Sequence, residues 1–169
     1  MIIKKMFFGS VLASIVIVSC IKGNNKCSHN DSTVIAPASE VDSLKTILLD
    51  SGITATQNPS GFFYKINQQG SGVSVTNLCS NLSVSYKGNF FNGKVFDSTV
   101  VNQIATFQLW QVIVGWQKGV PLISKGGEIT LYIPPTLAYG PNPVTDNNNN
   151  VIIPGNSYLV FDINLVDIQ

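Results

Sequence analysis

The chain contains 169 residues, of which 44% are hydrophobic and 11% are charged, and its formal net charge is +1. This length accommodates one domain with extensions, and the near-neutral charge without a basic cluster argues against nucleic-acid binding. The single histidine, His29, argues against a histidine-ligated metal site and is interpreted as plain surface rather than as a catalytic group. We therefore expect no metal and no cofactor.

Residues 1–19 have the pattern of a bacterial lipoprotein signal peptide. Two lysines, Lys4 and Lys5, precede an apolar stretch that is shorter than the roughly 20 residues of a membrane-spanning helix. The stretch ends in the sequence IVSC at 17–20, which resembles a lipobox and predicts cleavage before Cys20 and lipidation of that residue. An ordinary signal peptide followed by a chance cysteine is the alternative. Because residue 21 is Ile rather than Asp, the expected location is an outer membrane, with the lipid-anchored protein facing the periplasm.

The other two cysteines, Cys27 and Cys79, form an even pair once Cys20 carries lipid. Disulfides persist in an exported protein, so a Cys27–Cys79 bridge is predicted, with two free thiols as the alternative. Residues 20–38 are polar and without periodicity, which predicts a flexible tether.

A helix is predicted over residues 39–51, within a segment, 39–58, that leads into the main domain. Ser39 is the expected N-cap and Gly52 the expected stop, and apolar residues recur three and four apart at Val41, Leu44, Ile47 and Leu48. This stripe could pack on its own domain or on a partner subunit. We favour the first because one short helix needs tertiary packing, and the oligomeric state stays open.

Downstream, short segments of alternating polarity predict an antiparallel sheet with one buried face. The expected strands are 61–67, 82–88, 94–98, 105–109, 127–134 and 157–166, and Asn92-Gly93 predicts a hairpin turn after the second of them. Residues 114 to about 123 lack alternation and predict a short helix with Trp116, Val120 and Ile123 on one face. Pro121 should shorten its last turn. The predicted class is therefore α+β.

These segments resemble, in order and spacing, an FKBP-type peptidyl-prolyl cis-trans isomerase domain. The resemblance rests on VSYKG at 84–88, NGKVFDS at 92–98, ATFQLWQVIVGWQKGVPLI at 105–123, LYIPPTLAYG at 131–140 and IIPGNSYLVFDINL at 152–165. It implies a domain over 59–169: a five- to six-stranded antiparallel half-barrel sheet wrapped around one short helix. Trp110 departs from the family pattern because it is bulky, and Ala105 stands near the place of a pocket phenylalanine in some members.

The same resemblance implies a hydrophobic pocket that binds proline-containing polypeptides. Its catalytic residues would be Trp116 as the floor, Asp97 and Tyr139 at the rim, and the backbone N–H of Ile113, which would bind a substrate carbonyl. Its substrate-binding walls would be Tyr86, Phe96, Val112, Ile153 and Phe161. From the residues alone, Tyr86, Val112 and Phe161 could equally be plain core, and Asp97 could cap a turn or pair with a lysine.

The implied activity is isomerisation of X-Pro bonds during the folding of exported proteins. Rotation about the bond makes and breaks no covalent bond, so neither a nucleophile nor a metal is required. A lipid-anchored proline-peptide-binding module, or a holdase with little turnover, is the alternative.

Overall fold

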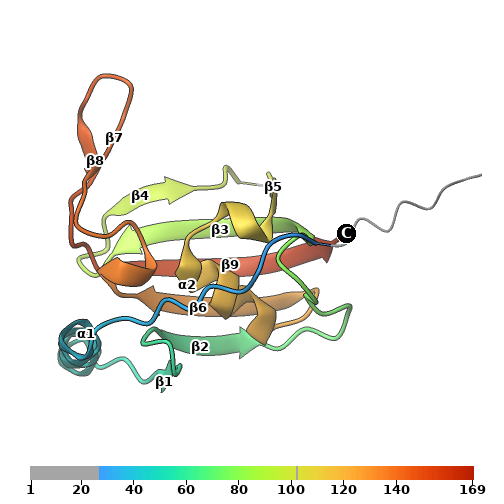
Figure 1. Ribbon diagram of the computed structural model, residues 1–169, viewed down its shortest axis with the longest axis horizontal. Helices are drawn as coiled ribbons and strands as arrows, with labels where there is room; N and C mark the ends of the chain where they lie inside the picture. Colours follow the sequence, from blue (N-terminus) through green and yellow to red (C-terminus); the bar gives the residue numbers. More distant parts are fainter. Residues whose placement is uncertain (1–26, 102) are drawn as a thin grey trace, which may run out of the picture.

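The computed structural model describes residues 27–101 and 103–169. The predicted signal peptide and the predicted lipidation site, Cys20, lie outside the described residues. Figure 1 shows a curved sheet with one short helix, α2, lying across its middle strands and a second helix, α1, at one end.

Across the described residues, one antiparallel sheet has the strand order β1-β2-β6-β9-β3-β4, and β5 also pairs with β3. The strands are β1 (Thr56–Gln57), β2 (Phe63–Gln68), β3 (Asn81–Phe90), β4 (Val95–Ser98), β5 (Ala105–Gln108), β6 (Gly127–Ile133) and β9 (Leu159–Ile168). Strands β4 and β5 share one edge of β3, since β5 pairs with residues 81–84 and β4 with residues 87–89. The predicted class and half-barrel are confirmed, with the two-residue strand β1 added at the edge.

The helix α2 (Val114–Gly119) packs against β6 at close range because two of its residues are glycines. A Cβ atom added to Gly115 would lie 2.6 Å from Ile133 Cδ1, and one added to Gly119 would lie 2.6 Å from Leu131 Cδ2. Trp116, Val120 and Ile123 are all buried, as predicted for one helical face. The α-helix ends at Gly119 and continues as a 3-10 turn, η2 (Val120–Leu122), that contains Pro121. This agrees with the expectation that proline shortens the last turn.

Helix α1 (Ala38–Asp50) packs on one end of the opposite face of the sheet from α2 (Figure 1). Its residues Leu44 and Leu48 are 0% and 3% exposed and pack on a cross-strand row of Phe63, Tyr132 and Val160. Because side chains alternate along a strand, this row points away from the core that surrounds Trp116. The predicted packing of the helix on its own domain is confirmed.

The predicted N-cap, Ser39, is wrong by two residues. The N-cap is Pro37, whose carbonyl accepts hydrogen bonds from the N–H groups of Glu40 and Val41. The Glu40 carboxylate instead accepts bonds from the N–H and hydroxyl of Thr136, at 2.9 and 2.7 Å, which ties the helix to the body. Gly52, at φ 66°, follows the helix end as predicted.

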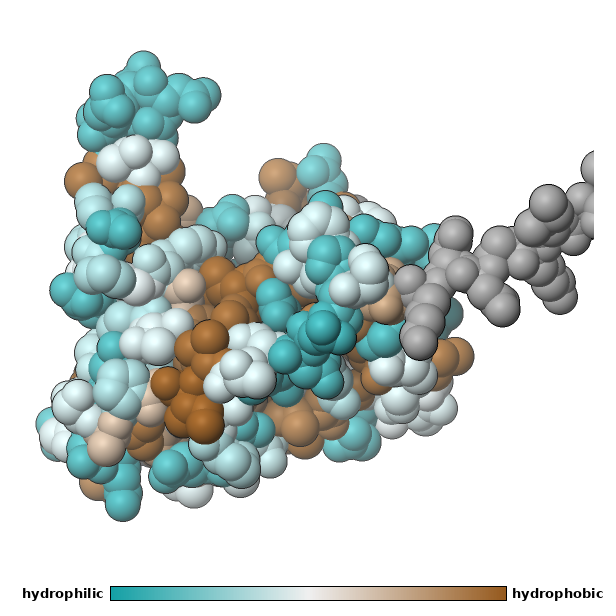
Figure 2. All heavy atoms as spheres, in the orientation of Figure 1, coloured by the Kyte–Doolittle hydropathy of each residue, from teal (hydrophilic) through white to brown (hydrophobic). Residues whose placement is uncertain are grey.

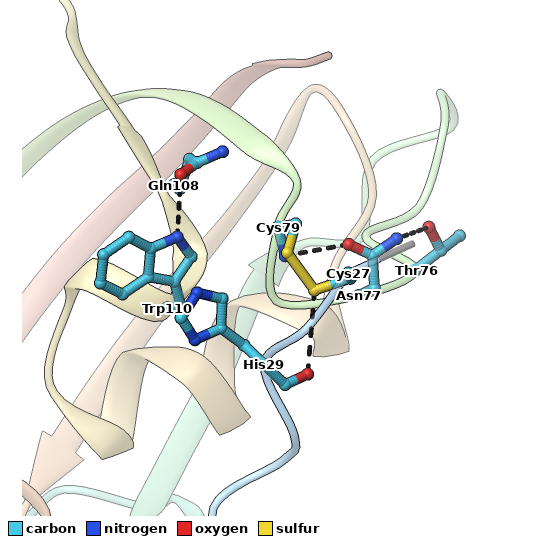
Figure 3. Close-up of a disulfide and its surroundings, with 7 residues drawn as sticks. All are labelled: Cys27, His29, Thr76, Asn77, Cys79, Gln108 and Trp110. Carbon is cyan, nitrogen blue, oxygen red and sulfur yellow. Dashed lines mark hydrogen bonds between the residues drawn. A yellow bond between two sulfur atoms is a disulfide. The ribbon is translucent and has the colours of Figure 1, made fainter. Parts of the chain in front are cut away.

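Residues 27–37, within the predicted tether, form neither helix nor strand and lie along the body. The predicted disulfide is present and joins Cys27 to Cys79. Figure 3 shows His29 stacked on Trp110, with ring centroids 4.3 Å apart and planes 9° apart, while the Trp110 indole N–H donates to Gln108 Oε1 at 2.8 Å. Further along, the Ala36 N–H donates to the Ser60 carbonyl at 3.0 Å. The bulky Trp110 therefore has a structural partner in the N-terminal segment.

A hairpin of β7 (Val144–Thr145) and β8 (Val151–Ile153) projects from the body, and alternation did not predict it because its strands are so short. Its turn is built by Asp146, whose carboxylate accepts hydrogen bonds from the Asn148 and Asn150 N–H groups and from the Asn150 side chain. These bonds hold the pKa of Asp146 below its usual value. Figure 2 shows a hydrophilic tip above a more hydrophobic stem.

The predicted strands are all present, and each end lies within two residues of its predicted position. The strand predicted at 157–166 runs from Leu159 to Ile168, for example, because its pairing with β3 continues to Ile168. The predicted turn after β3 is also present, with Gly93 at φ 83°. Among the described residues, no helix is long and apolar enough to cross a membrane.

Candidate active site

A cavity of about 250 Å³ opens beside the N-terminus of α2, on the face of the sheet that carries this helix. Five aromatic side chains line it, four of them from α2, β3, β5 and β9. The cavity is lined by Tyr86, Asp97, Phe107, Gln111, Val112, Ile113, Trp116, Tyr139 and Phe161. A larger cavity of about 470 Å³ lies behind α2, but no aromatic side chain lines it.

Trp116 is held at the floor of the cavity by three neighbouring rings. Its ring centroid lies 5.3 Å from those of Tyr86 and Phe161, both nearly perpendicular to it, and 5.8 Å from that of Phe107. Edge-to-face packing of this kind is favourable because the positive ring edge meets the negative face. The indole is 4% exposed, and its N–H has no hydrogen-bond partner among the described residues. The floor is thus a rigid apolar surface with one unused donor.

The polar rim is formed by Tyr86, Asp97 and Tyr139. The Tyr86 hydroxyl donates to Asp97 Oδ2 at 2.6 Å, which joins β3 to β4 across the mouth of the cavity. Burial, and after it the hydrogen bond to Asp97 and the charge of Asp97, raise the pKa of Tyr86 well above its usual value. Burial and then the Asp97 charge also raise the pKa of Tyr139. Both phenols therefore stay protonated at neutral pH and can act as donors.

The connection between η1 (Leu109–Gln111) and α2 presents backbone donors to the cavity. Gln117 Nε2 donates to the carbonyls of Val112 and Trp110, at 2.7 and 3.2 Å, and the Gln108 N–H donates to Gln111 Oε1 at 2.9 Å. These bonds fix the chain on both sides of Ile113, the N-cap of α2. No acceptor among the described residues takes the Ile113 N–H, so this donor is free for a ligand.

Seven of the sequence-predicted site residues line this one cavity. They are Tyr86, Asp97, Val112, Ile113, Trp116, Tyr139 and Phe161. The polar partner of Asp97 is the Tyr86 phenol rather than a lysine, and Tyr86 and Phe161, which could have been plain core, have a face on the cavity.

The structure does not place Phe96 and Ile153 on the cavity lining. The Phe96 ring packs behind Phe161, at a centroid distance of 5.5 Å, and against Phe90 at 5.1 Å. Ile153 is 4% exposed in β8 and belongs to the main core. Phe96 therefore contacts the cavity wall from outside the lining, and Ile153 is a core residue. The motif that implied these two residues gives their order in the chain but not their depth.

Two lining residues, Phe107 and Gln111, were missed by the sequence reasoning. The expected wall was sought at position 105, which is Ala, whereas Phe107 two residues later on β5 faces the cavity. The period-two alternation of ATFQL was the signal that could have found it, because residues 105 and 107 share one face. Gln111 lies in a 3-10 turn, which no periodicity in the sequence marked.

Among the described residues, no group of histidine, cysteine and carboxylate side chains is arranged to hold a metal ion. His29 lies on Trp110, outside the cavity lining. The chemistry available in the cavity is therefore that of its aromatic walls, the Asp97 carboxylate, two phenols and the Ile113 N–H.

Residues 76–166, more than half of the chain, match the model of the FKBP-type peptidyl-prolyl cis-trans isomerase family. The chain belongs to this family. It is 41% identical over 119 residues to an FKBP-type peptidyl-prolyl cis-trans isomerase, FkpA, of Buchnera aphidicola subsp. Schizaphis graminum, which covers 70% of this chain and 44% of that protein. It is 39% identical over 111 residues to FkpA of Escherichia coli K12, which covers 65% of this chain and 38% of that protein.

Solved structures show the same fold. The crystal structure of FkpA from Escherichia coli matches 78% of this chain and 60% of its own, with a TM-score of 0.65 and 32% identity. The crystal structure of AtFKBP13 matches 69% of this chain and 99% of its own, with a TM-score of 0.62 and 32% identity. This chain spans less than half the length of the curated relatives it matches.

Proposed function

We propose that this chain is a peptidyl-prolyl cis-trans isomerase and that the cavity over Trp116 is its active site. The observation that carries the proposal is the combination of an aromatic, almost fully buried floor with free hydrogen-bond donors at its edge. A proline ring is apolar and fits against such walls, while the flanking carbonyls need donors. Membership of the family supports the same activity.

The barrier to rotation about an X-Pro bond is about 18–20 kcal/mol because rotation breaks the amide resonance. The twisted amide has less charge separation than the planar one, so moving it from water into an apolar cavity costs less. A site that binds the twisted form more tightly than the planar form lowers the barrier by that difference in binding free energy. The apolar lining of the cavity supports this form of catalysis.

Each polar group of the cavity has a proposed role in this reaction. The Ile113 N–H donates to a substrate carbonyl on one side of the rotating X-Pro bond. The Tyr139 hydroxyl donates to a second carbonyl at the exposed rim. Asp97, held by the Tyr86 phenol, orients the rim and places a negative charge beside the rotating amide. Val112 and Phe161 complete the walls around the proline ring.

We also propose that the protein acts on exported polypeptides from a membrane surface. The support is the lipobox-like sequence ending at Cys20 and the Cys27–Cys79 disulfide, which suits an oxidising compartment. Substitution of Cys20 by Ala should release the protein from the membrane fraction. Continued membrane association of the Cys20→Ala variant, with no lipid on the parent by mass spectrometry, would contradict lipid anchoring.

A proline-limited refolding assay tests the enzyme claim, and the chain offers a matched pair of tryptophans. We expect Trp116→Leu to lower kcat/KM at least about tenfold, since the floor of the cavity is lost, and Asp97→Val to lower it as well. Trp110→Leu, which removes an exposed indole outside the cavity, should behave as the parent does. The claim fails if the parent gives no acceleration, or if all three variants match the parent.

The alternative is a binding module or holdase that uses the same cavity without useful turnover. It predicts that proline-containing peptides bind and that Trp116→Leu weakens this binding, while the rate of isomerisation stays at the uncatalysed value. Isothermal titration calorimetry beside the refolding assay separates the two functions.

A further inference from the structure

A second groove of about 450 Å³ lies at the end of the molecule that carries α1, and we call it the end groove. Its apolar walls come from α1, from the turn between β3 and β4, and from β8. The principal lining residues are Ile47, Phe90, Phe91, Lys94, Ile152 and Tyr158. In Figure 1 these three elements lie together at the left of the sheet.

The end groove is not a part of the cavity over Trp116, because the two share no lining residue. One of its walls, Ile47, belongs to α1, which lies outside the residues that match the family model. Another wall, Ile152, is 38% exposed, and its neighbour Val151 is 55% exposed. Exposed apolar side chains that gather in a groove are typical of a binding surface for a protein or a ligand.

The end groove lies close to the cavity, since a line of packed aromatic rings connects a wall of one to a wall of the other. Phe90 lines the groove and lies 5.1 Å from Phe96, which lies 5.5 Å from Phe161 on the cavity wall. Gly88 makes room for these rings, since a Cβ atom there would lie 2.7 Å from Phe96 Cζ and 2.9 Å from Phe161 Cε1. Two ring steps correspond to about three residues of extended chain, at about 3.3 Å per residue.

The charge of the groove narrows the class of occupant. Lys94 is the one charged side chain among the described residues that line it, and the remaining polar groups are the neutral Asn92, Ser157 and the Tyr158 hydroxyl. An apolar side chain with a carboxylate close to it in the chain would complement this lining.

We propose that the end groove is a second binding site for the same polypeptide substrate. An apolar side chain three or four residues from the proline occupies it, and an acidic neighbour in the substrate pairs with Lys94. This inference rests on the proposed function of the cavity. The groove gives the isomerase a preference for long, unfolded chains with apolar residues near proline, which a short peptide does not reveal.

Matched peptides test the proposal. One is a four-residue peptide with a single Leu-Pro bond. The others are twelve-residue peptides in which a Leu followed by Glu lies four residues before or four residues after the proline, each with a Ser-Ser control. We expect one Leu-Glu peptide to give a kcat/KM about tenfold above its Ser-Ser control, since burial of one leucine is worth about this factor or more.

Two substitutions on α1 test whether the end groove causes the higher rate on the Leu-Glu peptide. Ile47→Asp should remove the advantage of the Leu-Glu peptide and leave the rate on the four-residue peptide unchanged. Leu49→Asp, on the same helix but 69% exposed and outside the groove, should retain the advantage. Lys94→Glu should shift the preference from Leu-Glu to Leu-Lys peptides, which a merely structural role of Lys94 would not produce.

Equal rates for Leu-Glu and Ser-Ser peptides in the parent would overturn the proposal, as would equal losses in Ile47→Asp and Leu49→Asp. Failure of the proposed function gives a different result, in which no peptide is isomerised faster than without protein. In that case NMR titration with the Leu-Glu peptide still tests the groove, because shifts at Phe91 and Ile152 would support it and their absence would overturn it.

Discussion

Each face of the sheet carries a helix packed on apolar side chains, but only one face holds the candidate active site. On one face, α1 places Leu44 and Leu48 on Phe63, Tyr132 and Val160. On the other, α2 packs closely on β6 through its glycines, and the aromatic rings beside its N-terminus leave a cavity of about 250 Å³. The apolar composition of a face does not distinguish packing from function.

What distinguishes the cavity is the combination of open space with polar groups at its edge. Tyr86, Asp97 and Tyr139 meet around its mouth, and the Ile113 N–H is free. By contrast, the polar group that anchors α1, the Glu40 carboxylate, accepts a hydrogen bond from Thr136 at each of its two oxygens. Satisfied polar groups hold a structure together, whereas unsatisfied donors beside an apolar cavity are available to a ligand.

The largest expected effect is a loss of stability when the packing of α1 on the sheet is disrupted. Leu44→Ala should lower the free energy of unfolding by about 3–5 kcal/mol, because Leu44 is 0% exposed and its loss leaves a cavity. The isomerase rate of the folded protein should stay at the parent value, and chemical denaturation with a peptide assay measures both. Leu49→Ala, at an exposed position of the same helix, should change stability by less than about 0.5 kcal/mol. A loss of activity in folded Leu44→Ala would show that the two faces are coupled.

A somewhat smaller effect is expected when the disulfide is removed. The bridge joins residues 52 apart, and a disulfide typically contributes about 2–4 kcal/mol by limiting the conformational freedom of the unfolded chain. The double substitution Cys27→Ser with Cys79→Ser should lower the free energy of unfolding by that amount without changing the rate on a short peptide. A reductant should produce the same loss in the parent and none in the double variant. Equal stability of oxidised and reduced parent would contradict this expectation.

The smallest effect concerns the rim of the cavity. Tyr86→Phe removes the hydrogen bond to Asp97 and should lower kcat/KM about two- to fivefold, because the carboxylate loses its anchor. The pKa of Tyr86 is raised in the folded state, so its contribution to stability is fully present below pH 10 and is lost as the pH rises above 10. The free energy of unfolding should therefore fall less steeply above pH 10 in Tyr86→Phe than in the parent.

Asp97→Asn is the matched control for this pH dependence, since it keeps the burial of Tyr86 and removes the neighbouring charge. Its slope above pH 10 should lie between those of the parent and Tyr86→Phe. Identical slopes in all three proteins would mean that Tyr86 titrates alike in the folded and unfolded states.

Alternation in strands such as β9, and its absence around Trp116, are local patterns that predicted the sheet and the short helix. The seven cavity-lining residues were predicted only through the resemblance to the FKBP family, because its motifs assign residues to the pocket by their position in the chain. Apart from the Cys27–Cys79 bridge, the sequence did not predict how deeply residues are buried or which distant residues are in contact. Phe96 and Ile153 do not line the cavity, whereas Phe107 does, and such differences in depth depend on how the strands curve in the folded sheet. The stacking of His29 on Trp110 joins residues far apart in the chain. The sequence alone therefore showed Trp110 only as a departure from the family pattern, without the partner that explains it.

The Cys27–Cys79 bridge also determines how the protein bears mechanical load. A pull on the chain ahead of Cys27 passes through the bridge to Cys79, two residues before β3 begins, and so reaches the strand that pairs with β4, β5 and β9. The loop between the two cysteines, which contains α1 and β2, lies outside this path and carries no tension. The helix that forms one wall of the end groove would therefore keep its place on a protein held by its N-terminus.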